Sequence, residues 1–389
     1  GLISPRSVVR SHFPLPFYMN IFNNKIPIAF FLFFFIFLLI NPGYYWQDYN
    51  YIYENNIINS FKNYKEVSGY HTYFRPLMYF HLRFFDFFNM SEFFYNLINS
   101  LSWYLCIISV YFVFNLKDFI DDRFFLYALF PSISSAIVVS GQYITLSHAI
   151  IFITMSGFFL KNFFINRKIF NLIFFNIFFL LSLLTYEIVF VLMPLLFLIT
   201  SKKKNYLFIL INISVILLFF VIFNKIIIEL FLDVQMDTRI RSINFNSIPI
   251  FVSNLLIALR IVLIDIFHLY LESVKNIFNN NNLKPIMLII MSFLACCYFY
   301  FKEESNKKVL FSKKFFLIIF AILIINLVLL TVTNFPPFMH GNYNRGIIGL
   351  LFCLSIVFST NFNNKIWKLL CYLIIFLNII SFINIRYNF

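Results

Sequence analysis

The chain has little charge, little glycine and little cysteine. Charged residues make up 12% of its 389 residues, with 8 glycines and 5 cysteines. A soluble domain carries about 25% charged residues, so this composition excludes an ordinary water-soluble globule. No glycine-rich phosphate loop is present, which argues against an enzyme that binds a nucleotide. The cysteines all lie in apolar runs without metal-ligand spacing, so we expect small buried side chains and no metal site.

Apolar residues take the place of the missing charge. The chain is 61% hydrophobic, contains 60 phenylalanines and has a mean hydropathy of +0.84. One aqueous core cannot bury this surplus, and a helix of about 20 apolar residues satisfies its own backbone in lipid. We therefore expect an all-α polytopic membrane protein with about eleven transmembrane helices. The expected spans are 25–42, 93–114, 123–140, 144–160, 169–185, 187–200, 206–224, 285–301, 315–333, 346–359 and 366–384.

The positive charge is clustered in a way that predicts topology. The net charge is +14, and most lysines and arginines lie in short clusters between apolar runs. Cytoplasmic loops collect such residues, which explains the charge without a nucleic-acid partner. If residues 248–284 crossed the membrane, the basic cluster at 302–314 would lie outside. We therefore expect one or two in-plane helices around 248–284, and further in-plane helices in the first outer loop, 41–90.

The N-terminal segment differs from the rest of the chain. Residues 1–18 contain prolines and precede Met19, which opens a segment that resembles a natural start. We expect residues 1–18 to be a leader, a tag or an upstream extension without regular structure. Residues 19–389 show no internal repeat and no soluble domain, so we expect a single transmembrane domain.

Asp48 is the first candidate for chemistry. It follows the first expected span in the segment NPGYYWQDYN, beside Trp46. A carboxylate near the membrane boundary is partly desolvated, which is costly unless the group is used or paired. Aromatic residues also collect at membrane interfaces, where a solvated aspartate has no special role. Asp48 is therefore either a functional carboxylate or part of an interfacial belt.

The run Tyr73–Asp86, YFRPLMYFHLRFFD, is the second candidate. Pro76 can begin a helix, Arg75 precedes it, and His81 and Arg83 follow on the same expected in-plane helix. A guanidinium can hold a phosphate through two parallel hydrogen bonds. The alternative is that these cations contact lipid headgroups.

Two shorter segments on the outer side complete the candidates. Glu187 interrupts an apolar stretch, 171–200, that is long enough for two spans, so it marks either a tight outer turn or a buried carboxylate. His340 and Arg345 lie between two expected spans in the segment FPPFMHGNYNR. Gly341 permits close backbone approach there, so the segment is either an anion site or a plain turn.

Several segments, in order, resemble the GT-C superfamily of polyprenyl-phosphate-sugar-dependent glycosyltransferases, especially the protein O-mannosyltransferase-like branch. The matching segments are WQDY around Asp48, YFRPL at Tyr73–Leu77, YNLINSLSWYL at Tyr95–Leu105 and LLTYEIVFVLMPL at Leu183–Leu195. The expected count of eleven spans is also similar to that of the protein O-mannosyltransferase-like branch. The chain departs from the family where Tyr49 follows Asp48 in place of a second acid, and where the second-span element lacks its usual histidine.

The resemblance implies an inverting sugar transfer at the outer face. Asp48 would be the general base, and Arg75, Arg345 and His340 would bind the donor phosphate. Acceptor or supporting roles would fall to Glu187, Trp46, Tyr73, His81 and Arg83. In being short and lacking an expected soluble domain, the chain resembles the bacterial glucosyltransferases that decorate O-antigen. We therefore expect a glucose donor on polyprenyl phosphate, a lipopolysaccharide acceptor and an inner-membrane location with a periplasmic site. No cofactor is expected, and dependence on a divalent metal stays open.

Two other classes of protein compete with this interpretation. An O-antigen polymerase is also polytopic and would use paired arginines in a late loop, for which Arg239, Arg241 and Arg345 are available. A lipid-linked-sugar flippase or transporter would carry charged residues at mid-membrane in both halves. The long first loop with Asp48 and Arg75 argues against the polymerase. The lack of an inverted repeat and the clustering of charges on the outer side argue against the flippase or transporter.

Overall fold

A computed structural model describes most of the chain, and every regular element in it is a helix. The described residues are 25–39, 92–132, 142–200, 202–223, 247–279, 283–302, 313–332, 337, 347–360 and 365–388. The expected all-α fold is confirmed for these residues. Residues 1–18, for which we expected a leader or tag, lie outside them.

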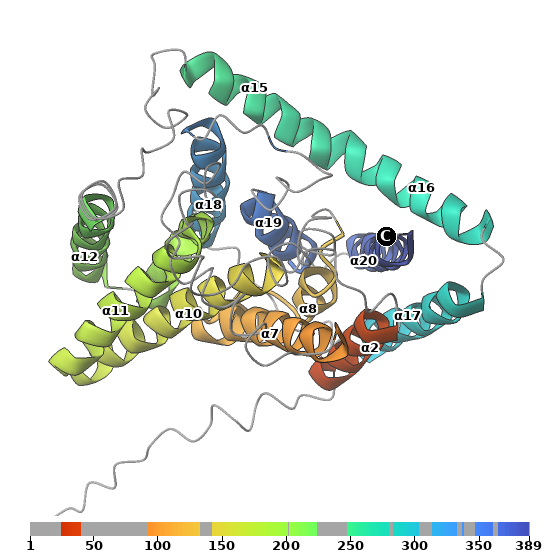
Figure 1. The fold of residues 1–389 in the computed structure, drawn as a ribbon, viewed down its shortest axis with the longest axis horizontal. Coiled ribbons are helices and arrows are strands. Elements are labelled where there is room, and N and C mark those ends of the chain that lie inside the picture. The colour runs from red at the N-terminus through yellow and green to blue at the C-terminus, as the bar shows by residue number, and fades with distance from the viewer. Residues whose placement is uncertain are drawn as a thin grey trace, which may run out of the picture.

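The helices are arranged around one apolar core (Figure 1). Their bounds are α2 (Ile26–Leu39), α7 (Glu92–Val113), η1 (Leu116–Asp118), α8 (Arg123–Ala128), α10 (Gln142–Asn166), α11 (Ile169–Thr185), η2 (Glu187–Ile199), α12 (Lys203–Ile222), α15 (Ser247–Arg260), η4 (Ile261–Asp265), α16 (Ile266–Asn279), α17 (Leu283–Lys302), α18 (Lys313–Val332), α19 (Ile348–Phe358) and α20 (Lys365–Asn388).

Most helices coincide with expected apolar spans, and the chain is a helical membrane protein. The stretch 248–279, which we expected to lie in the membrane plane, is also long and apolar enough to cross a bilayer. Within the described ranges, 6 helical stretches are long and apolar enough to cross a bilayer. Shorter apolar helices lie at 26–36, 169–185, 188–199, 315–331 and 348–358. One expected span is wrong as a continuous helix. We expected 123–140, but α8 ends at Ala128, and 133–141 lie outside the described residues.

The end of α8 is stabilised by a side chain from another helix. Asn378 of α20 donates from Nδ2 to the carbonyl of Phe130 at 2.6 Å and to that of Tyr127 at 3.4 Å. Its Oδ1 accepts from Ser132 Oγ at 2.5 Å and from Tyr270 OH at 3.3 Å. Backbone groups that leave a helix inside the membrane need partners from the protein. Asn378 supplies them, which is why the chain can break there.

Helix η2 is a long 3₁₀ helix in the middle of the bundle. It covers 13 residues and contains Pro194. A 3₁₀ helix rises about 2.0 Å per residue, so these residues reach about 26 Å, further than an α-helix of equal length. Gly349 lets α19 pack closely against both η2 and α18, because a Cβ there would clash with Val191 of η2 and lie 2.8 Å from Asn326 Oδ1 of α18. These 13 residues can therefore reach from one end of the bundle towards the other.

The basic clusters of the described residues gather at one end of the bundle, which we call the lysine end. The contacts that join them are Asp121 to Ser359, Lys161 to Asn115, Lys368 to Tyr300, Phe119 to Phe315 and Phe163 to Phe208. Helices α7, α10 and α17 end here, and α12, α18 and α20 begin here. The other end of each of these helices therefore points away from the lysines.

Helices α15, η4 and α16 form one long rod that crosses the bundle. Figure 1 shows the rod lying across the view, where α20 is seen along its axis. Asn254 of the rod donates to Thr331, in the last turn of α18, at 3.2 Å. Ser273 donates to Ser381, in the second half of α20, at 3.2 Å. Both contacts lie far from the lysine end, although the two rod residues are about 28 Å apart along the helix axis.

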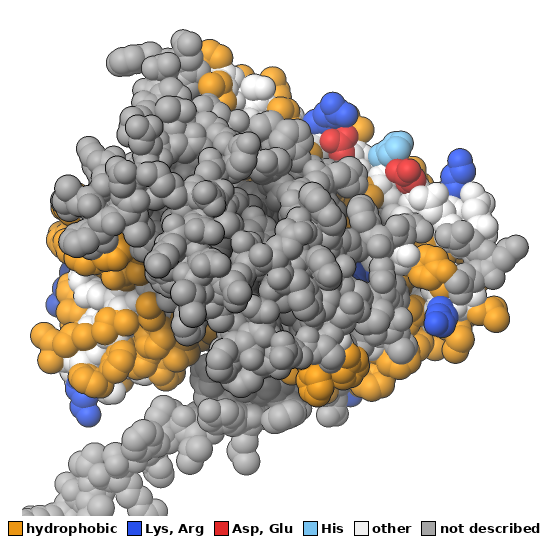
Figure 2. Space-filling view, viewed as in Figure 1, with side chains coloured by type: hydrophobic (Ala, Val, Ile, Leu, Met, Phe, Trp, Pro, Cys, Tyr) orange, Lys and Arg blue, Asp and Glu red, His pale blue; other side chains and the backbone are white. Residues whose placement is uncertain are grey.

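The rod has faces of three kinds. Buried residues contact the bundle, exposed apolar residues form a second stripe, and exposed polar residues form a third. Figure 2 shows charged and histidine side chains in a row over α15–α16. The bundle face includes Asn254, Ile261, Tyr270, Ser273 and Ile277; the apolar stripe includes Leu256, Leu263, Phe267, Leu271 and Phe278; the polar stripe includes Arg260, His268, Glu272 and Lys275. Such a division suits a helix in the plane of a membrane interface.

Candidate functional site

Most residues that the sequence analysis singled out lie outside the described part of the chain. They are Asp48, Trp46, Tyr73, Arg75, His81, Arg83, His340 and Arg345. Only Glu187 falls within it, as the first residue of η2, and its side chain is not among those described. The roles assigned to these residues stay predictions.

The described helices that border these segments have their adjoining ends on the same side of the bundle. Helix α7 begins, and α18 ends, at the end opposite the lysines. Helix η2 ends at Ile199, which packs beside Gly157 of α10 and Phe114. A Cβ on Gly157 would lie 3.3 Å from Ile199 and 2.8 Å from Phe114, which follows the end of α7 at the lysine end. Glu187, at the start of η2, therefore lies at the opposite end. Helix α19 ends next to Ser359, which contacts Asp121 at the lysine end, so the start of α19 also lies at the opposite end. The predicted site segments are attached to this opposite end.

The turn at Glu187 is tight. Helix α11 ends at Thr185 and η2 begins at Glu187, with Tyr186 alone between them in an extended conformation. Tyr186 is 4% exposed. The backbone therefore shows a tight turn between two helices. The alternative, a buried carboxylate at Glu187, stays a prediction because that side chain is not among those described.

Helix α7 carries a row of buried polar side chains near its start. Asn96, Asn99, Ser100 and Ser102 are all buried. Within the described part of the chain, Asn99 Oδ1 accepts no hydrogen bond. An orphaned acceptor inside a membrane protein is costly unless something donates to it. A hydroxyl-rich ligand at this end of α7 would satisfy it.

His148 of α10 is a residue that the sequence analysis missed. Its Nε2 lies 3.2 Å from Ser102 Oγ, so it joins α10 to the polar row of α7. Polar contacts of this kind tie membrane helices together. The available signal was an imidazole in an otherwise apolar span, which is rare enough to merit attention. The partner on α7 could not be read from the sequence.

Arg386 is a second residue that the sequence analysis missed. It lies in the last turn of α20, opposite the lysine end, and is 3% exposed. One turn earlier, Phe382 packs against Phe33 of α2 with ring centroids 6.3 Å apart. The chain continues from the end of α2 towards Asp48. A buried guanidinium thus lies on the side of the bundle to which the predicted catalytic segment is attached.

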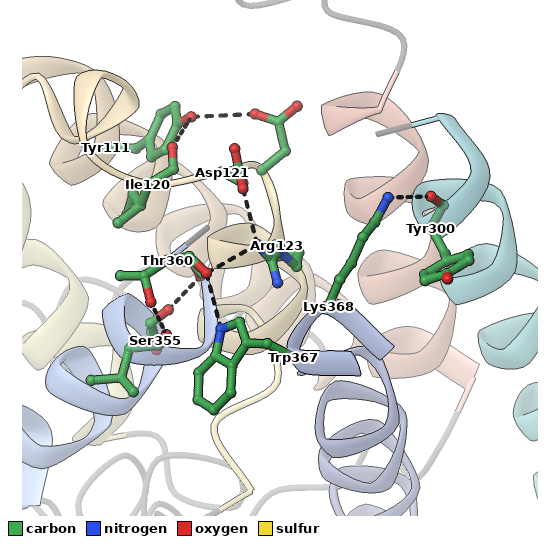
Figure 3. A network of polar contacts seen from close by, with 12 residues as sticks. Tyr111, Ile120, Asp121, Arg123, Tyr300, Ser355, Thr360, Trp367 and Lys368 are labelled. Atoms are coloured by element: carbon green, nitrogen blue, oxygen red, sulfur yellow. Dashed lines mark hydrogen bonds and ion pairs between the residues drawn. The ribbon is translucent and has the colours of Figure 1, made fainter. Parts of the chain in front are cut away.

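A separate polar network closes the lysine end (Figure 3). Arg123, 1% exposed, pairs with Asp121 at 2.9 Å and donates to the carbonyl of Thr360 at 3.1 Å. Trp367 Nε1 donates to the same carbonyl at 3.2 Å. The network ties the loop before α8 to the loop before α20. Because it lies at the opposite end from the predicted site, we assign it a structural role.

The described residues bring no group of three or more histidine, cysteine, aspartate or glutamate side chains together as a metal site. Comparison with protein families found no matching family model, and neither curated proteins nor solved structures gave a match.

Proposed function

We propose that this chain is an inverting glycosyltransferase that moves a sugar, glucose in our interpretation, from a polyprenyl-phosphate donor to an outer-face acceptor. The acceptor that fits best is O-antigen or another lipopolysaccharide glycan. The observation that carries the proposal is the shared location of helix ends. The start of α7, the start of η2, the end of α18 and the start of α19 all lie opposite the lysines.

Asp48 acts as the general base in this proposal. Its carboxylate takes the proton of the acceptor hydroxyl while that oxygen attacks the anomeric carbon from the face opposite the phosphate. The bond between that carbon and the phosphate oxygen breaks, and polyprenyl phosphate leaves with the electron pair. Inversion follows from the single displacement, and no cofactor is consumed.

Cations hold the charge that develops on the leaving phosphate. Arg75 and Arg345 are proposed for this role, with His340 beside them, because a guanidinium contacts two phosphate oxygens at once. Such bonds favour the transition state in a water-poor site. Arg386 adds a buried guanidinium at the same end of the bundle. Asn99, whose buried Oδ1 accepts no hydrogen bond, is proposed to accept one from a sugar hydroxyl.

The proposed topology has eleven spans, with the lysine end in the cytoplasm of a bacterium and the site on the periplasmic side. Gathering of the basic clusters at one end supports this orientation. The rod α15–η4–α16 lies in the plane of the outer interface and is not counted as a span. Its contacts with the far ends of both α18 and α20 support this placement.

Cysteine labelling tests the topology. Ser253 and Lys275 are exposed residues of the rod about 33 Å apart along its axis, and Lys302 is exposed at the lysine end. In intact cells, an impermeant maleimide is expected to label Ser253→Cys and Lys275→Cys, while Lys302→Cys reacts only after the membrane is opened. If only one of the two rod positions reacted from outside, the rod would cross the membrane and the eleven-span topology would be wrong.

A transfer assay tests the function. The purified protein in nanodiscs is expected to release polyprenyl phosphate from polyprenyl-phosphate glucose and to label lipopolysaccharide with glucose. A polymerase would ignore this monophosphate and extend diphosphate-linked glycans instead. A flippase would move the lipid-linked sugar across a vesicle membrane and leave the sugar–phosphate bond intact. Either of these results would replace the proposal.

A further inference from the structure

The described residues of the lysine end carry far more positive than negative charge. The described acidic residues at this end are Asp118, Asp121 and Asp122, and Asp121 is already paired with Arg123. The described cations with exposed side chains there include Arg167, Lys168, Lys202, Lys204, Lys302, Lys313 and Lys365. The charge of this surface is therefore not balanced by the described residues.

Helix dipoles add to this positive potential. Helices α11, α12, α18 and α20 begin at the lysine end, and none has an acidic residue in its first turn. Each instead has a cation there or just before it: Lys168, Lys204, Lys313 and Lys365 respectively. The start of a helix carries about half a positive charge, so a cation at this position is unfavourable by itself. Anions from outside the chain would remove this cost.

Two lysines at this end are held on aromatic side chains. Lys302 donates to Tyr298 OH at 2.6 Å and lies 5.0 Å from the centre of its ring. Lys368 donates to the carbonyl of Tyr300 at 2.8 Å and lies 4.6 Å from that ring. Tyrosines of this kind sit at the headgroup level of a membrane. The ammonium groups are thereby placed at the depth of lipid phosphates.

Exposed apolar side chains continue from these cations along the same helices. Phe301 on α17 and Ile366 and Leu369 on α20 are 82%, 69% and 59% exposed. A ligand that matches this surface needs an anionic head and apolar chains. Free phosphate satisfies only the first requirement and a neutral lipid only the second.

We propose that the lysine end binds anionic phospholipids of the adjoining leaflet, with their headgroup phosphates on its exposed lysines. This surface is separate from the proposed transfer site, which lies at the opposite end, and it does not depend on the transfer reaction. Juxtamembrane lysines each contribute an attraction to anionic lipids equivalent to about fivefold in affinity. Binding would fix the basic helix starts in the membrane.

Charge removal at the two ends tests the proposal. The variant K204Q/K302Q/K365Q removes three exposed cations from the lysine end. The matched control R260Q/K275Q/K284Q removes three exposed cations from the rod and the start of α17. The measurement is the apparent dissociation constant for phosphatidylglycerol, obtained from its effect on the melting temperature in neutral detergent. We expect the lysine-end variant to bind on the order of 100-fold more weakly and the control to resemble wild type.

Three further arms make the result decisive. K204R/K302R/K365R keeps the charge and is expected to keep the lipid response, which separates charge from folding. Phosphatidylcholine and inorganic phosphate are expected to give little stabilisation of the wild-type protein. The proposal is overturned if the lysine-end variant responds like wild type, if the control loses the response equally, or if inorganic phosphate stabilises as much as phosphatidylglycerol.

Discussion

Asp48→Asn is expected to lower sugar transfer by about 10²–10⁴-fold, the usual effect of losing a general base. The substitution is nearly isosteric but cannot accept the hydroxyl proton, so the chemical step fails while the membrane fold persists. The measurement is the rate of glucose transfer from polyprenyl-phosphate glucose at saturating donor, with membrane insertion checked by fluorescence of a fused reporter.

Glu187→Gln is the comparison, because Glu187 is assigned a supporting role at the start of η2. It is expected to reduce transfer less than Asp48→Asn does. Donor binding by the Asp48 variant should be close to that of wild type. Transfer within a few-fold of wild type would remove Asp48 from the mechanism, while inactivity of the wild-type protein itself would reject the proposed function.

Arg123→Met is expected to lower the free energy of unfolding by about 3–5 kcal/mol, the cost of breaking a buried ion pair from one side. Arg123 is 1% exposed and its partner Asp121 is 10% exposed, so the carboxylate would be left with little water. The carbonyl of Thr360 would lose a donor as well. The measurement is unfolding in a denaturing detergent, followed by circular dichroism.

Arg260→Met provides the matched control. Arg260 also pairs with an aspartate, Asp265, at 3.2 Å, but its side chain is 70% exposed. Exposed pairs contribute about 0–1 kcal/mol, so this variant should remain close to wild type. Adding Asp121→Leu to Arg123→Met removes the orphaned carboxylate and is expected to recover part of the loss. Equal stability of the two single variants would show that the network in Figure 3 does not hold the lysine end together.

The long helices could be predicted because each is encoded locally. An uninterrupted apolar run of sufficient length has one stable arrangement in lipid, so helices such as α11, α17 and α20 begin and end close to the expected residues. The basic clusters likewise predicted one shared end. The candidate catalytic residues, Asp48 and Arg75 among them, lie outside the described ranges, so the structure gives no geometry for them.

The sequence did not predict the features that depend on contacts between helices far apart in the chain. Residues 123–140 are apolar enough for a span, but α8 ends at Ala128, shortly before Pro131, and Asn378 of α20 satisfies the freed carbonyls. His148 meets Ser102, and Arg386 is buried, through contacts between helices far apart in sequence. Hydropathy measures how a segment fits lipid and carries no information on which polar groups meet.

The sequence alone determined that this chain is a helical membrane protein with its basic residues on one side, because composition and local apolar length decide how a segment meets a bilayer. Only the tertiary structure decided that residues 187–199 form a 3₁₀ helix and that α15–η4–α16 contacts the far ends of α18 and α20, although the basic cluster at 302–314 had already predicted that this segment lies in the membrane plane. The rod is as apolar as a span, at a mean hydropathy of 2.3. Its direction follows from hydrogen bonds at Asn254 and Ser273, which exist only once the other helices have packed.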